Sequence, residues 1–159
     1  MANHYSTQIE IVGPSTQVQT LWRELLKQSC DSVANCEYGS FEIRNRPDGG
    51  GRMLAYTRGE SPLYRLKDIC AIVPDCLIWG GTMTGQFAEE SIFERGMRIG
   101  HVEATMCADD DDNSFEDSNG DPVEWLRDEF EQKVHAHIST LPVNPFLKPL
   151  ELAMSEASQ

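Results

Sequence analysis

The residues with the most potential for chemistry lie in one acidic stretch, MCADDDDNSFEDSNGDPVEW, from Met106 to Trp125. Clustered carboxylates can bind a divalent cation, face a basic partner, or solvate a loop. An EF-hand calcium loop needs a glycine at its sixth position and a glutamate at its twelfth. With Gly120 in the sixth place, the first and twelfth places fall on Phe115 and Leu126, so this register fails. Only loose cation binding, at about millimolar concentrations, is left for this stretch.

The histidines and glycines do not form a catalytic or metal-binding motif. His135 and His137 lie two positions apart on an expected helix, so they point to different faces. His4 and His101 could act as general acid and base, but a single histidine on a strand, such as His101, is more often a hydrogen-bonded structural residue. The glycines at 49–51 lack the Lys-Ser/Thr of a phosphate-binding loop. The sequence therefore predicts no catalytic residues, no metal site, no cofactor and no enzymatic activity.

The five cysteines predict a reducing compartment. An odd number of cysteines, in a chain whose N-terminus MANHYSTQIEIVG lacks the features of a secretion signal, is typical of reduced thiols in a cytosol. Five residues separate Cys30 from Cys36 and Cys70 from Cys76, which is too many for a zinc knuckle. We interpret these cysteines as small buried hydrophobic residues. No apolar run is long enough to cross a membrane.

Most of the net negative charge belongs to one segment. Between Ala108 and Glu131 there are eleven acidic residues and one base, Arg127, which gives −10 of the total −13. Such a segment repels nucleic acid and attracts basic proteins or cations. Direct nucleic-acid binding is therefore not expected. From the sequence, a surface that faces a partner and a solvated loop are both open interpretations.

Six short segments of the sequence are expected to form the first strands and helices of the fold. Apolar periodicity and the Gly, Pro and Ser signals predict the order strand, helix, strand, strand, helix, strand. Ser61 is the expected N-cap of the second helix, and Pro62 takes its first position. The order is that of a split βαβ, ferredoxin-like α+β domain, an antiparallel sheet with two helices on one face. The six segments span residues 8–12, 18–26, 40–44, 52–57, 62–73 and 76–79.

Two more strands and a third helix extend this plan. The strands, at 91–94 and 97–104, are separated by a turn. After an acidic loop at 108–121, a capping box predicts an acidic C-terminal helix over 122–139. Residues 1–141 then form a single domain. The remainder, 142–159, contains prolines and is expected to be a largely unstructured tail.

Several short motifs in residues 1–106 resemble a known family. They are MAN at the start, IEIVGP at the end of the first strand, the Ser61-Pro62-Leu63 helix start, the helix end at Pro74, and ESIFERG at 90–96. This pattern resembles the YubB-like ferredoxin-like domain family of phage and plasmid proteins. The resemblance implies a mobile genetic element in the cytoplasm of a bacterial host cell. Small acidic proteins of such elements often block host defence machinery, and the family implies no catalytic residues.

Together these observations predict a non-catalytic acidic interaction protein. It would bind and occlude a basic nucleic-acid-binding surface of a host defence complex, as an anti-CRISPR protein or a DNA mimic does. Helix-mounted acids at i and i+4 lie about 6 Å apart, a spacing suited to imitating a phosphate row. The residues predicted to contact the partner are Asp109, Asp110, Asp111, Asp112, Glu116, Asp117, Glu124, Asp128 and Glu131.

Two alternatives remain open at this point. The first is a divalent-metal-dependent hydrolase that acts on nucleic acid or nucleotides and uses acids of the same stretch. The second is a scaffold that forms a homodimer through exposed sheet edges, which ferredoxin-like domains often offer.

Overall fold

The computed structural model describes residues 4–31, 40–46, 50–58, 61–106, 115–116, 120 and 123–139. In this part the chain is an α+β protein with a seven-stranded antiparallel sheet and three α-helices. The strands are β1 (His4–Val12), β2 (Ser40–Asn45), β3 (Gly51–Arg58), β4 (Leu77–Met83), β5 (Phe87–Glu94), β6 (Met97–Met106) and β7 (Phe115–Glu116). The helices are α1 (Ser15–Asp31), α2 (Pro62–Ile69) and α3 (Arg127–Ser139), and a 3-10 turn, Cys70–Ile72, continues α2.

The sheet is ordered β2-β3-β1-β4-β5-β6-β7, and every neighbouring pair is antiparallel. The predicted order of the first six elements is observed, and β1 lies centrally between β3 and β4. The predicted extension by two strands is also observed, and β7 adds a third. The sheet is therefore larger than the four strands of a simple split βαβ unit.

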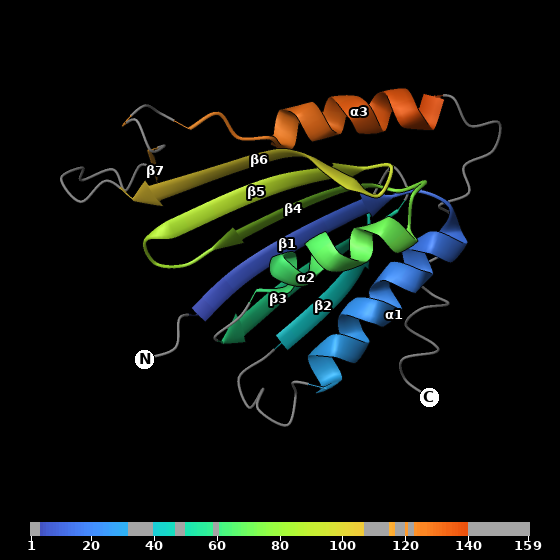
Figure 1. Cartoon of the computed structure of the whole chain (residues 1–159), viewed down its shortest axis with the longest axis horizontal. Coiled ribbons are helices and arrows are strands. Elements are labelled where there is room, and N and C mark those ends of the chain that lie inside the picture. The colour runs from blue at the N-terminus through green and yellow to red at the C-terminus, as the bar shows by residue number, and fades with distance from the viewer. Residues whose placement is uncertain are drawn as a thin grey trace.

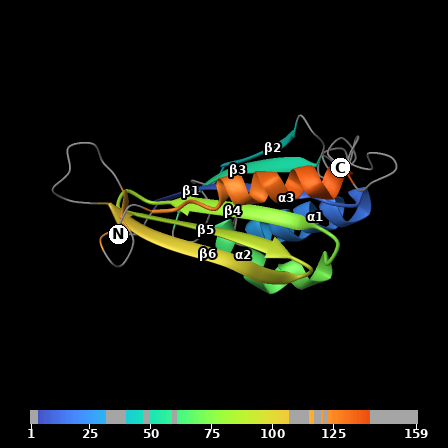
Figure 2. The same cartoon turned by 90° about the horizontal axis from the view of Figure 1, so that it is seen from above.

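The two faces of the sheet bury different side chains. On β1, Ile9 and Ile11 lie in the core beneath α1 and α2, whereas Val12 lies in a second core that contains Phe130 of α3. Adjacent residues on a strand point to opposite faces, which explains this division. Figures 1 and 2 show the result: α1 and α2 lie on one side of the sheet, and α3 lies on the other.

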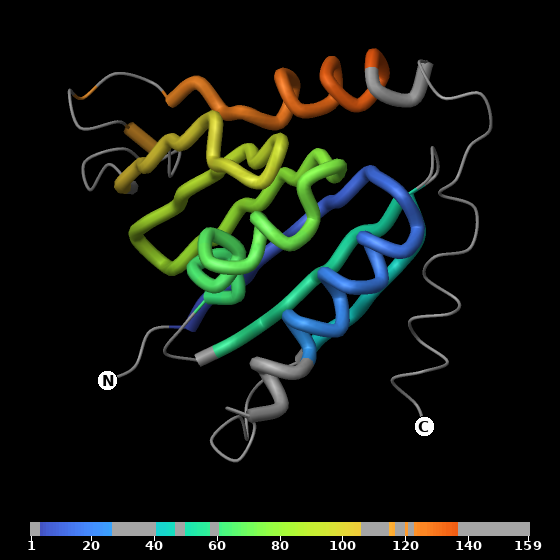
Figure 3. Tube along the Cα trace, turned by 45° about the vertical axis from the view of Figure 1, so that its right-hand side comes forward, coloured from blue at the N-terminus to red at the C-terminus, as the bar shows by residue number. Residues whose placement is uncertain are grey.

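Glycines let the helices of the first face approach the sheet closely. A Cβ at Gly80 would lie 2.4 Å from Leu63 Cδ1 of α2, and one at Gly51 would lie 2.8 Å from Cζ2 of Trp22 in α1. These contacts place α1 over β3 and α2 over β4, an arrangement that can be followed in Figure 3. As predicted, Ser61 caps α2 by accepting a hydrogen bond from the backbone N–H of Leu63 at 3.1 Å.

The third helix covers only one end of the opposite face. Phe130 and Val134 are buried there and pack in one cluster with four sheet residues. These four residues are Val12, Leu77, Trp79 and Ile92. They come from the end of β1, the beginning of β4 and the last part of β5. The other end of the same face is not covered by a described helix.

The predicted start of the third helix at residue 122 is wrong, because α3 begins at Arg127. Residues 123–125 are not helical, and Trp125 packs edge-on against Phe115 at 6.1 Å between ring centroids. The carbonyl of Leu126 accepts the first helical hydrogen bond, from Phe130 N–H at 3.0 Å. Tertiary packing of an aromatic residue here outweighs a local capping signal.

Part of the predicted acidic loop also has regular structure. Within 108–121, Phe115 and Glu116 form β7, which pairs with Met106 and Thr105 of β6. The rest of that loop, apart from Gly120, and the predicted tail at 142–159 lie outside the described residues. In the described part of the chain, no helix is long and apolar enough to cross a membrane.

Candidate functional site

A groove of about 780 Å³ occupies the end of the sheet face that α3 leaves uncovered. Strands β1 to β5 supply most of its surface, and β7 and the segment before α3 supply one wall. Its larger apolar side chains are Leu54, Tyr56, Trp79, Met83, Phe115 and Trp125. Its charged side chains include Glu42, Glu90 and Arg127. A mostly apolar depression with a few charged groups is the usual form of a binding site.

The groove contains several large apolar side chains that water can reach. Tyr56 is 45% exposed, Met83 is 49% exposed and Trp125 is 39% exposed. A monomeric protein gains nothing in folding from apolar groups left in water, so a gathered exposed patch indicates an interaction surface. Tyrosine and tryptophan are also the residues that most often dominate the energy of protein interfaces.

At its inner end the groove is closed by a tryptophan held between two charged groups. Trp79 donates a hydrogen bond from Nε1 to Glu90 Oε1 at 2.7 Å, and the Arg127 guanidinium lies 4.6 Å from the Trp79 ring centroid. Burial raises the pKa of Glu90, although the Trp79 hydrogen bond and the Arg127 charge partly offset it. The inner end therefore offers a carboxyl group in a partly dry setting, which suits a cationic or hydrogen-bond-donating group of a ligand.

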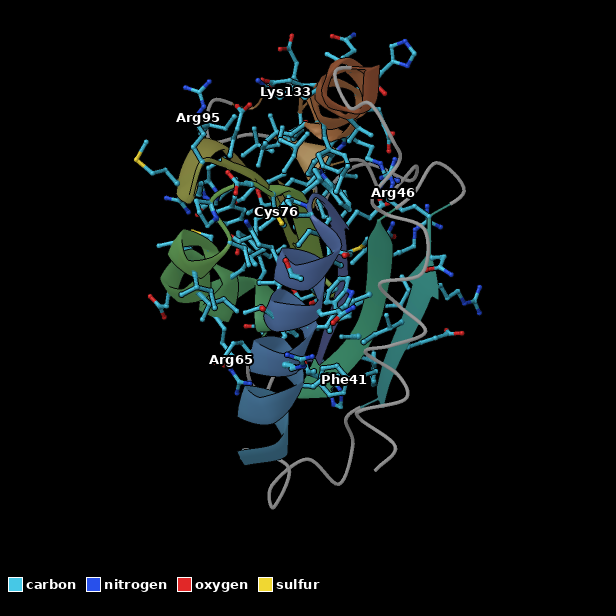
Figure 4. The ribbon with its side chains drawn as sticks, turned by 90° about the vertical axis from the view of Figure 1, so that its right-hand side faces the viewer. Phe41, Arg46, Arg65, Cys76, Arg95 and Lys133 are labelled. Carbon is cyan, nitrogen blue, oxygen red and sulfur yellow. The ribbon has the colours of Figure 1, made fainter. Side chains whose placement is uncertain are left out.

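Arg127 is fixed by an ion network behind the groove. The carboxylate of Glu10 is fully buried, with Arg46 at 2.8 Å, Arg52 at 3.1 Å and Arg127 in direct contact. Arg46 also binds Glu131 of α3 at 2.9 Å, and Figure 4 shows Arg46 between the strands and α3. The network therefore joins β1, β3, the residue that follows β2, and α3, and it holds α3 against the sheet beside the groove.

Among the acids predicted to face a partner, Glu131 has a different role. Its carboxylate binds Arg46 at 2.9 Å and Arg127 at 3.1 Å. Partial burial alone would raise the pKa of Glu131, but the hydrogen bond and charge of Arg46, together with Arg127, hold it below the ordinary value. The charge of Glu131 is thus compensated within the protein.

The other described acids of the prediction lie near the groove or on α3. Glu116 is partly buried in β7, Glu124 is exposed next to Trp125, and Asp128 is exposed in the first turn of α3. The sequence predicted a helical row of acids that included Glu124, Asp128 and Glu131. Glu124 precedes α3, so it does not belong to such a row. The remaining five acids, Asp109, Asp110, Asp111, Asp112 and Asp117, lie outside the described residues.

The aromatic residues of the groove were not predicted from the sequence. The alternation of side chains along β3 could have indicated Leu54 and Tyr56. They are two residues apart and face away from the buried Met53 and Ala55. No local pattern connects them with Trp125, which is distant in sequence. The groove is a product of the sheet order and is absent from any one segment.

The described cysteines are structural, as predicted. Cys70 and Cys76 are buried and free, and burial raises the pKa of the Cys76 thiol to about 12. Such a thiol is protonated at neutral pH and is a weak nucleophile. The prediction that His101 is hydrogen-bonded is confirmed, since its Nδ1 lies 3.0 Å from Ser91 Oγ. Among the described residues, the side chains that could hold a metal ion are Glu89, His101 and Glu103.

No family model matches the chain, and neither a curated protein nor a solved structure does. The resemblance to the YubB-like family therefore stays a prediction.

Proposed function

We propose that the protein is a non-catalytic binding protein whose groove takes apolar side chains from a basic surface of a protein partner. One observation carries this proposal. The segment 108–131, which holds −10 of the net charge of −13, also supplies Phe115, Trp125 and Arg127 to the groove. The most acidic part of the chain therefore adjoins an accessible aromatic surface.

The aromatic surface and the acidic residues around it would contribute to binding in different ways. Apolar anchors that fill a groove supply most of the affinity of a typical interface, and surrounding polar residues exclude water. Glu42, Glu116 and Glu124 lie in the groove lining or directly beside lining residues, where they can pair with lysines and arginines of a partner. Such charges increase the association rate and select basic partners.

Single-stranded nucleic acid suits this groove less well, although aromatic side chains can stack on bases. Nucleic-acid channels combine such platforms with cationic side chains that neutralise phosphates. Among the described residues, the charged side chains that face the groove are Glu42, Glu90 and a single cationic residue, Arg127, whose guanidinium already binds Glu10 and Glu131. A phosphate backbone would meet net negative charge.

A nucleic-acid-handling protein is the class of partner that best fits an acidic binding surface, because its own active surface is basic. Occupation of that surface would occlude it, in the manner of a DNA mimic or an anti-CRISPR protein. The proposal that the partner is a host defence complex in a bacterial cytoplasm, and that the chain comes from a mobile element, rests on the resemblance to the YubB-like family.

We also propose that the first half of the chain is a ferredoxin-like unit. Its support is the strand order β4-β1-β3-β2, with α1 after β1 and α2 after β3 on the same face. Strands β5 to β7 and α3 are then additions. Of these additions, β5, β7 and the start of α3 line the groove, together with β1 to β4.

Capture of a partner from bacterial lysate tests the function. The full chain, immobilised at low salt, is expected to retain a basic protein that elutes as salt rises. Trp125→Ala should reduce the captured amount at least about tenfold, since loss of a central aromatic anchor commonly costs 2 kcal/mol or more. Ile72→Ala is a matched control, because Ile72 is 48% exposed in the turn after α2, away from the groove. Equal loss in both variants would contradict the proposal.

A homodimeric scaffold is a second candidate, and one observation favours it. In the described part of the chain, β7 pairs only with Thr105 and Met106, so most of the outer edge of β6 has no strand beside it. Met97 and Ile99 on β6 are 64% and 45% exposed. Light scattering of the purified chain distinguishes a dimer from a monomer. The metal-dependent hydrolase that uses the acidic stretch stays a prediction, because five of its acids lie outside the described residues.

A further inference from the structure

The face of the sheet opposite the groove carries a group of potential metal ligands where β5 and β6 pair. Glu89 lies opposite Glu103, and Ser91 lies opposite His101. Side chains two residues apart on a strand share a face. Phe93, which continues the same alternation, belongs to the core beneath α1 and α2. The four polar side chains therefore project from the α1 and α2 side of the sheet.

A β-bulge creates this arrangement. Phe93 pairs with Arg98, but its neighbour Ile92 pairs with Gly100, which leaves Ile99 as an extra residue in β6. A one-residue shift of register moves every following side chain to the other face. Without the bulge, His101 and Glu103 of β6 would lie on the opposite face of the sheet from Glu89 of β5.

The side chains are oriented toward a common point. Ser91 Oγ lies 3.0 Å from His101 Nδ1, and it holds the ring so that Nε2 faces the carboxylates. Nε2 lies 2.9 Å from Glu103 Oε1 and 3.8 Å from Glu89 Oε2. One ligand atom from each of the three residues lies within 4.8 Å of the others. Metal-binding histidines usually have a hydrogen-bond partner on the second ring nitrogen, and Ser91 Oγ takes that place here.

Glu89 supplies a separate indication of a ligand. The residue is only 3% exposed, and among the described residues its Oε1 has no hydrogen-bond partner. A buried carboxylate oxygen without a partner is unfavourable. The other Glu89 oxygen, Oε2, lies 3.8 Å from His101 Nε2, so a cation held by both carboxylate oxygens would also satisfy Oε1.

We propose that Glu89, His101 and Glu103 bind a divalent first-row transition-metal ion such as Zn²⁺. An imidazole with two carboxylates suits this class, whereas Mg²⁺ and Ca²⁺ prefer ligand sets made only of oxygen. Zinc–ligand distances of about 2.0–2.2 Å place ligand atoms roughly 3.3 Å apart, close to the present separations. The Glu103 side chain is 60% exposed, so it has room to adjust. Three protein ligands leave a position open to water.

Calorimetric titration of the metal-stripped full chain with zinc chloride tests the site. The wild-type protein should bind one zinc ion tightly, in addition to any loose binding by the acidic stretch. His101→Gln and Glu89→Gln should weaken the tight event at least about a hundredfold, and Ser91→Ala should weaken it by about 10–100-fold. Glu90→Gln is the matched control, because Glu90 is the adjacent residue but faces the groove. It should keep the wild-type affinity.

Further variants exclude other sources of the signal. Replacement of Asp109, Asp110, Asp111 and Asp112 by asparagine should leave the tight event unchanged. Circular dichroism in a chelator reports whether each variant folds, and Glu103→Gln, at a largely exposed side chain, provides a change of ligand that leaves the fold intact. Zinc should raise the melting temperature of the wild type but not that of Glu103→Gln. Absence of tight binding in the wild type, or its persistence in His101→Gln and Glu103→Gln, would overturn the proposal.

Discussion

At the scale of single residues, the molecule places an unusual amount of charge behind its groove. Glu10 is fully buried on the central strand, and three arginines contact it. Such a group tolerates burial only because every oxygen is paired with a cation. The arginines in turn hold α3, so a buried carboxylate helps to shape the surface that we propose as the partner site.

Glu10→Gln is expected to destabilise the protein by about 3–5 kcal/mol, because it removes one partner from a buried set of charges. Arg46, whose side chain is only 4% exposed, would lose its buried counter-ion. Chemical denaturation measures the change in the free energy of unfolding. Glu42→Gln is the control, since the pair of Glu42 with Arg44 is exposed and should be worth less than about 1 kcal/mol. Similar costs for both variants would refute this account of the network.

Glu131→Gln should lose stability in a pH-dependent way. The folded-state pKa of Glu131 lies below the ordinary 4.5, so its carboxylate stabilises the fold at neutral pH. That contribution is present above the unfolded pKa and is lost as the pH falls through the lowered folded value. The gap in unfolding free energy between wild type and variant should therefore be largest near pH 7 and should narrow below about pH 4.5. Asp128→Asn, an exposed acid of the same helix, provides the comparison, and a gap that is constant with pH would contradict the assignment.

At the scale of elements, the turn between β5 and β6 aligns the first residues of the two strands, before the bulge at Ile99 shifts their pairing. Glu94 pairs with Met97 across a two-residue turn in which Arg95 has φ 55° and Gly96 has φ 75°. Positive φ at both positions is the type I′ geometry that matches the twist of a hairpin. Glycine adopts it without cost, but arginine does not.

Arg95→Asn should therefore raise the free energy of unfolding by up to about 1 kcal/mol, because asparagine tolerates this backbone region better. Thermal and denaturant unfolding would both report the gain. Arg95→Lys keeps the charge and the backbone cost, so it should leave stability unchanged. Stabilisation by lysine as well would show that side-chain charge, and not the turn, is the cause.

The sequence predicts those elements whose signals are local. The apolar stripe of α1, the Ser61–Pro62 start of α2 and the alternation in β1 indicate the first six elements in the correct order. The start of α3 is mispredicted, because Trp125 packs on Phe115, a contact that no local pattern contains. Long-range packing decides such boundaries.

The candidate sites are harder to predict for the same reason. The groove gathers single residues from strands far apart in the sequence, and only the strand order brings them together. The histidine–carboxylate cluster depends on the bulge at Ile99, and no local residue preference predicts this bulge. Without that bulge, the alternation of β6 would place His101 and Glu103 on the wrong face.

At the scale of the whole molecule, the charge is concentrated on the segment that borders the groove. Ala108 to Glu131 carries −10 of the total −13 and includes Phe115 and Trp125. The opposite layer, built from α1 and α2, covers the main core. In the function proposed here, the groove side of the sheet contacts the partner and the other side mainly stabilises the fold.

Charge reversal should weaken partner binding through this segment without unfolding the protein. Glu116→Lys with Glu124→Lys places two bases beside the groove, where they would repel a basic partner. We expect the salt concentration that elutes the captured partner to fall clearly, because exposed charges act over about 8–10 Å and are screened by salt. Asp68→Lys, an exposed acid of α2, is the control and should elute like wild type.

Hydrogen exchange of the full chain, alone and with its captured partner, tests the central claim most directly. If the groove receives the partner, exchange should slow in the complex at the groove ends of β3 and β4 and around Trp125, with no change in α1 and α2. Protection confined to α1 and α2, or to the outer edge of β6, would contradict the claim that the acidic groove receives the partner.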